Sequence, residues 1–389
     1  MNKKNKLFIY GILILLFLPG IFLLTKINIG EKQLQGTQIK VERPQFTFDN
    51  FKAGKFQPNF EKYLNQELPL RPTFVRLNNQ FYYSFFSKSY MQDSNLVIGV
   101  NNNIYEKGYL DNYFMGKIDE KQMDSLINRL VSAQKIFSKY NKTMIFLVTP
   151  NKAEIYPEYA PKQYQQYGEN NDEDENYITF VKKLQVTDLN FIDSVQITKN
   201  LKEQSDLPVF PIGGTHWNTW AATETVNKII ENVNNKRKLN LPVLHIEKTI
   251  INTIPDGADG DLYNLLNIMR KPKFLCIHPV WEKKEFVGDK VPTAIITGSF
   301  GGMILDVLKN NANASGSILG PIDYSFYYKV VQLHVEKGKQ QTVEKQFPQM
   351  SKEEWKHSIL ANDVVIIELN SALPFGHVNA FLDDVEKYL

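Results

Sequence analysis

The sequence predicts an α/β fold in which helices flank a central parallel sheet. An amphipathic helical pattern that begins after Asp119 leads directly into the apolar run 143–148, which has the length of a strand. Two further apolar runs, 294–297 and 363–369, also have strand length, and the first is followed at once by helical apolar spacing. Continuous apolar strands that alternate with helices are typical of a parallel sheet covered on both faces.

Residues 1–29 are predicted to form a basic cytoplasmic flank and a transmembrane signal anchor. Lys3, Lys4 and Lys6 precede an apolar run from Leu7 to Leu24. About eighteen such residues just span a bilayer, and the positive flank stays in the cytoplasm. No small-residue cleavage pattern follows, so an uncleaved anchor is favoured over a cleaved signal peptide. We therefore expect a single-pass protein of the cell membrane.

The rest of the chain divides into a linker and one main domain. Residues 30–45 are polar and non-periodic, as expected of a tether, and residues 46–389 form the extracytoplasmic domain. Its first helix, after Pro69, has an aromatic face that is more typical of a core than of a sugar subsite. The patterns also predict a hairpin over 95–105, a helix over 177–184, a strand over 189–192, a capping-box helix start at Ser351 and a closing helix over 380–389.

Composition excludes several classes of function. The 389 residues are 43% apolar, which suffices for one sizeable core, and the net charge of +3 gives no argument for nucleic-acid binding. The single cysteine, Cys276, rules out an internal disulfide framework and a cysteine-based metal cluster. Its apolar neighbours indicate an inert core residue.

The acidic runs and the histidines do not predict a metal site. The run 169–176 lacks the spacing of a calcium loop and is interpreted as a solvated surface loop, and 256–261, with two Asp-Gly pairs, is interpreted as a turn. The six histidines show no paired metal spacing. We expect neither a metal nor an organic cofactor.

Ser299 is the candidate nucleophile. It lies in Gly298-Ser299-Phe300-Gly301-Gly302, between the strand 294–297 and a helical pattern. A serine at a strand-to-helix turn exposes its hydroxyl at the end of a rigid sheet, beside backbone N–H groups that can stabilise an oxyanion. A plain turn or a helix cap would give the same pattern.

His216 is the candidate general base. It lies in Gly213-Gly214-Thr215-His216-Trp217-Asn218, between an apolar run and a helical pattern. A histidine just off a strand and beside an aromatic residue has the fixed orientation and partial burial that a base needs. The alternative is a histidine that caps the helix or packs under Trp217.

Taken together, these stretches resemble the SGNH hydrolase-like alginate O-acetyltransferase family, extracytoplasmic enzymes that acetylate exopolysaccharides. The resemblance covers most of the chain beyond the N-terminal segment, and the order of its marks is more specific than any one of them. The marks are Phe56–Glu61 with Leu68–Arg71, Val97–Gly99 with Tyr105–Lys107, Val148–Glu158, Thr215–Asn218 and Gly298–Phe300.

The resemblance implies that Ser299 and His216 are the catalytic residues of an O-acetyltransferase with an SGNH-like sheet. The acceptor would be a polysaccharide, and a polytopic membrane-bound O-acyltransferase would be the partner that supplies the acyl group. No cofactor is implied. Lys152, Tyr324 and Arg71 are candidate substrate-binding residues. A carbohydrate acetylesterase with the same site and an inactive polysaccharide-binding or scaffold subunit are the alternatives.

Two positions depart from the family pattern. The family has an Asp two residues before the His, where this chain has Gly214, and often an Asp before the Ser, where it has Gly298. The acid of a triad orients the imidazole, and its loss costs orders of magnitude in rate. This leaves three alternatives. Another carboxylate takes the role of the acid, the Ser-His dyad works without an acid, or the protein has lost catalysis and only binds glycan. Asp193, after the strand 189–192, is a candidate substitute, although a helix-capping Asp is common at such a position.

Overall fold

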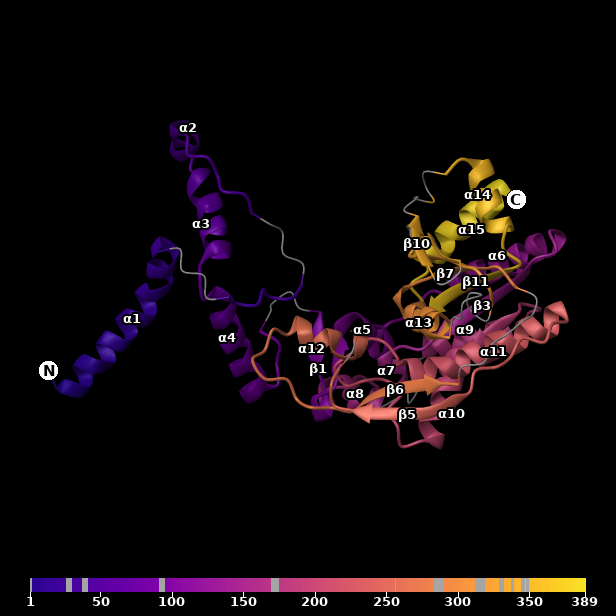
Figure 1. Ribbon diagram of the computed structural model, residues 1–389, viewed down its shortest axis with the longest axis horizontal. Coiled ribbons are helices and arrows are strands. Elements are labelled where there is room, and N and C mark those ends of the chain that lie inside the picture. The colour runs from indigo at the N-terminus through magenta and orange to yellow at the C-terminus, as the bar shows by residue number, and fades with distance from the viewer. Residues whose placement is uncertain are drawn as a thin grey trace. The chain divides into compact units, whose positions relative to one another are not determined.

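The chain forms two compact units in the computed structural model (Figure 1). The structure describes residues 2–25, 30–36, 41–90, 95–168, 175–255, 257–282, 290–311, 319–328, 332–336, 339–343, 347 and 350–389. Unit 1 comprises residues 1–94 and 263–271, and unit 2 comprises residues 95–262 and 272–389. The predicted domain start at residue 46 remains a prediction. Most of the predicted acidic loop, residues 169–174, lies outside the described residues.

Unit 1 is helical. Helix α1 (Lys3–Thr25) is, in the described part of the chain, the one helix that is long and apolar enough to cross a membrane. The others are α2 (Phe48–Lys52), α3 (Phe56–Glu67), α4 (Arg71–Phe86) and most of α12 (Asp261–Leu265). The aromatic face of α4 was expected to be buried, but Phe81 and Phe85 are 50% and 73% exposed. Phe74 and Phe86 are also exposed, at 39% and 54%, so the core interpretation is wrong for these four side chains.

The centre of unit 2 is a five-stranded parallel sheet of order β4-β3-β11-β7-β8. The strands are β3 (Thr143–Thr149), β4 (Phe191–Asp193), β7 (Thr293–Thr297), β8 (Ile322–Phe326) and β11 (Val364–Asn370). The predicted parallel sheet is confirmed. Because the last strand, β11, lies between β3 and β7, the strand order reverses there, and open sheets bind their ligands at the carboxyl ends beside such a point.

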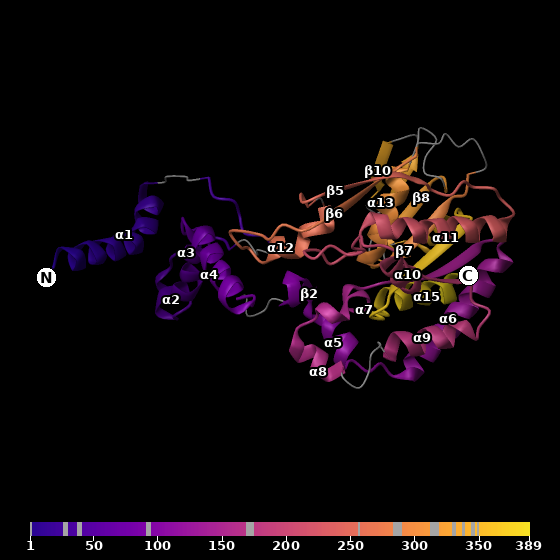
Figure 2. The same ribbon diagram turned by 90° about the horizontal axis from the view of Figure 1, so that it is seen from below.

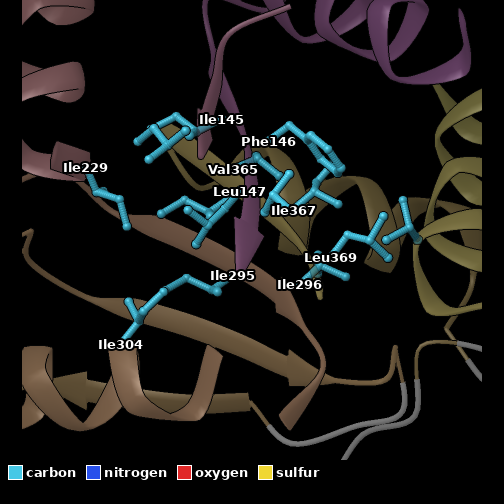
Figure 3. Packing of buried hydrophobic residues seen from close by; sticks show 14 of the residues in the cluster. Ile145, Phe146, Leu147, Ile229, Ile295, Ile296, Ile304, Val365, Ile367 and Leu369 are labelled. Atoms are coloured by element: carbon cyan, nitrogen blue, oxygen red, sulfur yellow. The ribbon is translucent and has the colours of Figure 1, made fainter. Parts of the chain in front are cut away.

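Helices cover both faces of this sheet. Figure 2 shows α11 (Thr219–Arg237) and α13 (Gly302–Asn310) on one face, and α6 (Glu120–Lys139), α9 (Glu175–Gln185) and α15 (Gly376–Tyr388) on the other. Ile229 of α11 and Ile304 of α13 point towards the side chains of Ile145, Leu147 and Ile295 (Figure 3). The intervening residues of each strand face the other way. Both layers are therefore apolar, which explains the continuous runs in the sequence.

The remaining elements surround this core. The predicted hairpin is present as β1 (Leu96–Ile98) and β2 (Ile104–Glu106), and the predicted capping box begins α14 (Lys352–Leu360). Two antiparallel pairs were not predicted: β5 (Ile246–Asn252) with β6 (Cys276–Trp281), and β9 (Gln332–Glu336) with β10 (Lys339–Val343). Short helices complete the unit: α5 (Lys107–Met115), α7 (Lys152–Ile155), α8 (Lys162–Gly168), α10 (Ser194–Gln204), η1 (Val100–Asn102), η2 (Pro157–Tyr159), η3 (Gly257–Gly260) and η4 (Ser299–Gly301).

Candidate active site

Ser299 lies in the tight turn that joins β7 to α13. Residues Ser299–Gly301 form the 3₁₀ turn η4, and α13 begins at Gly302. A Cβ atom at position 301 would collide with the hydroxyl of Thr297, so only glycine fits there. The first N–H groups of a helix have no partner within the helix. The turn therefore places the serine beside donors that can stabilise a negative charge.

A buried carboxylate holds Gly298, the residue before Ser299. Glu368 of β11 is fully buried, and its Oε2 accepts hydrogen bonds from the N–H of Gly298 at 2.6 Å and from Oγ1 of Thr297 at 2.8 Å. Its other oxygen accepts from the hydroxyl of Thr149 on β3. Glu368 thus joins the ends of three neighbouring strands under Ser299. The sequence signal that could have found it is a charged residue inside the apolar run 363–369.

The structure brings the His216 turn to the Ser299 turn. The indole N–H of Trp217 donates a hydrogen bond of 3.0 Å to the carbonyl oxygen of Phe300, and the rings of His216 and Phe300 lie 4.8 Å apart. The His216 side chain is 16% exposed, and neither ring nitrogen has a hydrogen-bond partner among the described residues. Both nitrogens are buried, and neither is hydrogen-bonded to Ser299. Catalytic hydrogen bonds often form only in the complex with substrate.

A carboxylate faces the Nδ1 side of this imidazole, and it belongs to Asp261. Its Oδ2 lies 3.6 Å from Nδ1 of His216. Its Oδ1 accepts hydrogen bonds from the N–H groups of Thr215 at 3.0 Å and Leu262 at 2.7 Å. The 3.6 Å separation is an ion-pair distance rather than a hydrogen bond. This is the side on which the acid of a triad orients its histidine.

The backbone beside Asp261 explains the missing acid at position 214. A Cβ atom on Gly214 would lie under 3.0 Å from the carbonyl oxygen of Ala258, which no real Cβ atom tolerates, and 2.8 Å from Cγ of Pro211. The N–H of Leu262 also donates to the carbonyl of Gly213 at 3.0 Å. The turn 257–262 thus occupies the space that an aspartate at position 214 would need. The same turn places the carboxylate of Asp261 beside His216.

Asp193 does not reach His216. Its Oδ1 caps α10 by accepting from the N–H groups of Val195 and Gln196, both at 3.1 Å, and its Oδ2 accepts from the hydroxyl of Tyr177 at 2.8 Å. It ends β4, three strands from β7, or about 14 Å at the usual spacing. The capping interpretation holds, and the proposal of Asp193 as substitute acid is corrected.

Lys152 is buried and supports the His216 turn rather than facing a ligand. Its ammonium donates to the carbonyl oxygens of Pro211 and Ile212, both at 2.8 Å, and to that of Ile104 at 3.1 Å. Burial lowers the pKa of Lys152 to about 7, and Asp261 acts in the opposite direction. The predicted substrate contact is therefore a positioning contact, because the carbonyls of Pro211 and Ile212 belong to the segment that leads to His216, and the carbonyl of Ile104 belongs to β2.

The other predicted substrate residues lie in different surroundings. Tyr324 is 6% exposed in β8, with its ring 5.0 Å from the ammonium of Lys309, so it packs in the unit. Tyr327, just after β8, is 51% exposed, and its N–H donates to the carbonyl of Thr297 at 2.7 Å. The structure thus offers Tyr327 as a further candidate near the Ser299 turn. Arg71 begins α4 in unit 1, and its role remains a prediction.

The parallel sheet defines an α/β fold, and the His216 turn, with the Asp261 carboxylate beside it, lies against the Ser299 turn. Residues 109–287 match the family model described as "SGNH hydrolase-like domain, acetyltransferase AlgX". This match confirms the family resemblance and supports an acyltransferase or esterase role. The matched segment contains His216 and Asp261 and ends before Ser299.

The chain also shows similarity to solved structures from several bacteria. The O-acetyltransferase domain of Pseudomonas putida AlgJ is 15% identical, with a TM-score of 0.45, over 75% of this chain and 98% of that one. Pseudomonas aeruginosa AlgX is 10% identical, with a TM-score of 0.43, over 75% and 67%. Bacillus cereus PatB1 is 10% identical, with a TM-score of 0.38, over 66% and 91%. At these values the likeness carries no argument about substrate. No curated protein shows a significant sequence match.

Proposed function

We propose that the chain is an O-acetyltransferase that moves an acetyl group through an acyl-serine onto hydroxyls of an extracellular or cell-wall polysaccharide. The observation that carries this proposal is the junction of the two turns. Trp217 bonds to Phe300, the ring of His216 packs on Phe300, and Asp261 faces Nδ1 of His216. In this proposal Ser299 is the nucleophile, His216 the base and Asp261 the orienting acid, which are the three roles that acyl transfer needs.

The reaction follows from these positions in two steps. In the first, His216 takes the proton of Ser299 as Oγ attacks the donor carbonyl, and it returns that proton to the leaving group. The acyl group then remains on Oγ. In the second, His216 takes the proton of a sugar hydroxyl, which attacks the acyl carbonyl, and Ser299 is regenerated with that proton. Backbone N–H groups at the start of α13 stabilise both tetrahedral oxyanions, and Asp261 stabilises the imidazolium.

The proposed setting is the outer face of the cell membrane. Helix α1, with Lys3, Lys4 and Lys6 at its start, supports an anchor with the remaining chain outside the cytoplasm. The partner would be a polytopic membrane-bound O-acyltransferase that supplies acetyl groups, and the polysaccharide would be the acceptor. In this setting a reactive acyl-serine faces its acceptor rather than the cytoplasm.

The test uses the full-length protein purified in detergent and an aryl acetate as donor. We expect release of the aryl alcohol by the wild type and a loss of at least about a thousandfold in Ser299→Ala and in His216→Ala. Adding an oligosaccharide acceptor and following its mass separates the two enzymatic functions. A gain of acetyl on the sugar supports transfer, whereas acetate alone indicates the acetylesterase alternative. If the folded wild type releases no aryl alcohol above background, both the transferase and the esterase are contradicted. The inactive polysaccharide-binding subunit would then be the remaining alternative.

A further inference from the structure

Three side chains that the acyl-transfer site does not use come together next to it. Asp259 lies in η3, and Cys276 and His278 lie on β6. One carboxylate oxygen, the thiol sulfur and one imidazole nitrogen all lie within 4.8 Å of one another. Cys276 and His278 are two residues apart on a strand, so they point to the same face. The three residues belong to unit 2, and we call them the Asp259 cluster.

We propose that the Asp259 cluster binds a zinc ion. Thiolate, imidazole and carboxylate are the three donors that zinc takes in proteins, at about 2.0–2.3 Å, which puts two donors of one tetrahedron about 3.3–3.8 Å apart. Nε2 of His278 and Oδ2 of Asp259 are 3.9 Å apart. A small movement of either side chain would bring these two atoms to the separation that a shared zinc ion needs. Sulfur and nitrogen donors disfavour calcium and magnesium. Three protein ligands leave the fourth position to water.

The cluster is largely buried. The Cys276 residue is 1% exposed, and the side chains of Asp259 and His278 are 12% and 29% exposed. Burial, with the Asp259 carboxylate beside it, raises the pKa of the Cys276 thiol to about 12. Zinc binding therefore displaces the thiol proton to solvent as the sulfur–metal bond forms. The bound cation then neutralises a carboxylate that is largely removed from water.

A zinc ion here would tie the turn 257–260 to β6. The same turn approaches Gly214 through the carbonyl of Ala258, and two residues after Asp259 it carries Asp261, which faces His216. Removing the metal would release this turn and with it the orientation of His216. This last consequence rests on the proposed function, whereas zinc binding itself does not.

The binding test uses the full-length protein in detergent, without a polyhistidine tag, dialysed against a chelator. Titration with Co²⁺ should produce a thiolate-to-cobalt charge-transfer band that saturates at one ion per chain, and Zn²⁺ should displace it. Cys276→Ser should abolish the band. His278→Gln, at the most exposed ligand, should lower zinc affinity by more than about a hundredfold. His245→Gln, an exposed histidine beside β5, is the control and should bind as the wild type does.

Two results would overturn the proposal: a folded wild type that takes up no zinc, or zinc uptake that is unchanged in both Cys276→Ser and His278→Gln. Because cobalt absorption and metal content do not depend on the acyl-transfer activity, a failure of the proposed function would leave these readouts intact. If zinc binds but its removal leaves aryl acetate turnover unchanged, the metal site is supported. The proposed effect of the metal on Asp261 and His216 would then be wrong.

Discussion

The carbonyl oxygen of Ala258 fills the space beside Gly214 in which a larger residue would place its Cβ atom. At this position the alginate O-acetyltransferase pattern has the acid of its triad. The backbone of the turn 257–262 occupies that space here, and the turn supplies the carboxylate of Asp261 to the same imidazole. In the proposed function, Asp261 therefore takes the role of that acid beside His216.

Restoring the family residue should harm the protein. In Gly214→Asp the new Cβ must displace Ala258 and the ring of Pro211, whose Cγ would be 2.8 Å away. Overpacking of this kind costs about 1–3 kcal/mol. We expect a lower midpoint of thermal unfolding and no gain in aryl acetate turnover. A variant that is both as stable as the wild type and more active would contradict this account.

Asp261→Asn and Asp193→Asn form a matched pair. Removing the charge that faces Nδ1 of His216 should lower kcat by about a hundredfold to ten-thousandfold. The same change at Asp193 should leave kcat within about twofold, because asparagine also caps helices well and this residue ends a distant strand. Steady-state kinetics on an aryl acetate measures both. Equal losses in the two variants would show that Asp261 has no special role.

Glu368→Gln tests the support under the nucleophile. The amide replaces one acceptor oxygen with a donor, so at least one of Gly298 N–H, Thr297 Oγ1 and the Thr149 hydroxyl loses its acceptor. The loss should be about 1.5–3 kcal/mol in the free energy of unfolding, with a fall in kcat. Glu353→Gln, on the exposed side of α14, is the control for urea unfolding. Unchanged stability in Glu368→Gln would refute the anchoring role.

The pH dependence of stability should report on Lys152. Its pKa is lowered to about 7 by burial, against 10.5 in the unfolded chain. Between these values the unfolded chain holds a proton that the folded chain does not, so this group makes the free energy of unfolding rise as the pH increases from 7 towards 10.5. Thermal unfolding at pH 7 and pH 9 should show a larger rise for the wild type than for Lys152→Met. Parallel curves would mean that Lys152 stays charged.

Periodicity made the sheet predictable, because each strand is covered on both faces. The runs 143–148, 294–297 and 363–369 correspond to β3, β7 and β11 within one residue at each end. The antiparallel pair β5–β6 was missed because its two strands are separated by 23 residues and β5 is largely exposed. A half-exposed pair has no continuous apolar run to reveal it.

Local patterns were enough to predict the α/β class, the strand-to-helix turn at Ser299 and the His216 motif, since strand and helix periods and turn glycines are local properties. The tertiary structure decided which carboxylate faces His216 and where Lys152 points. It also placed Glu368 under Ser299, and Cys276 and His278 beside Asp259. These side chains come from segments up to 219 residues apart, as Thr149 and Glu368 are. No local pattern encodes which segments meet, because the packing of the whole unit sets that choice.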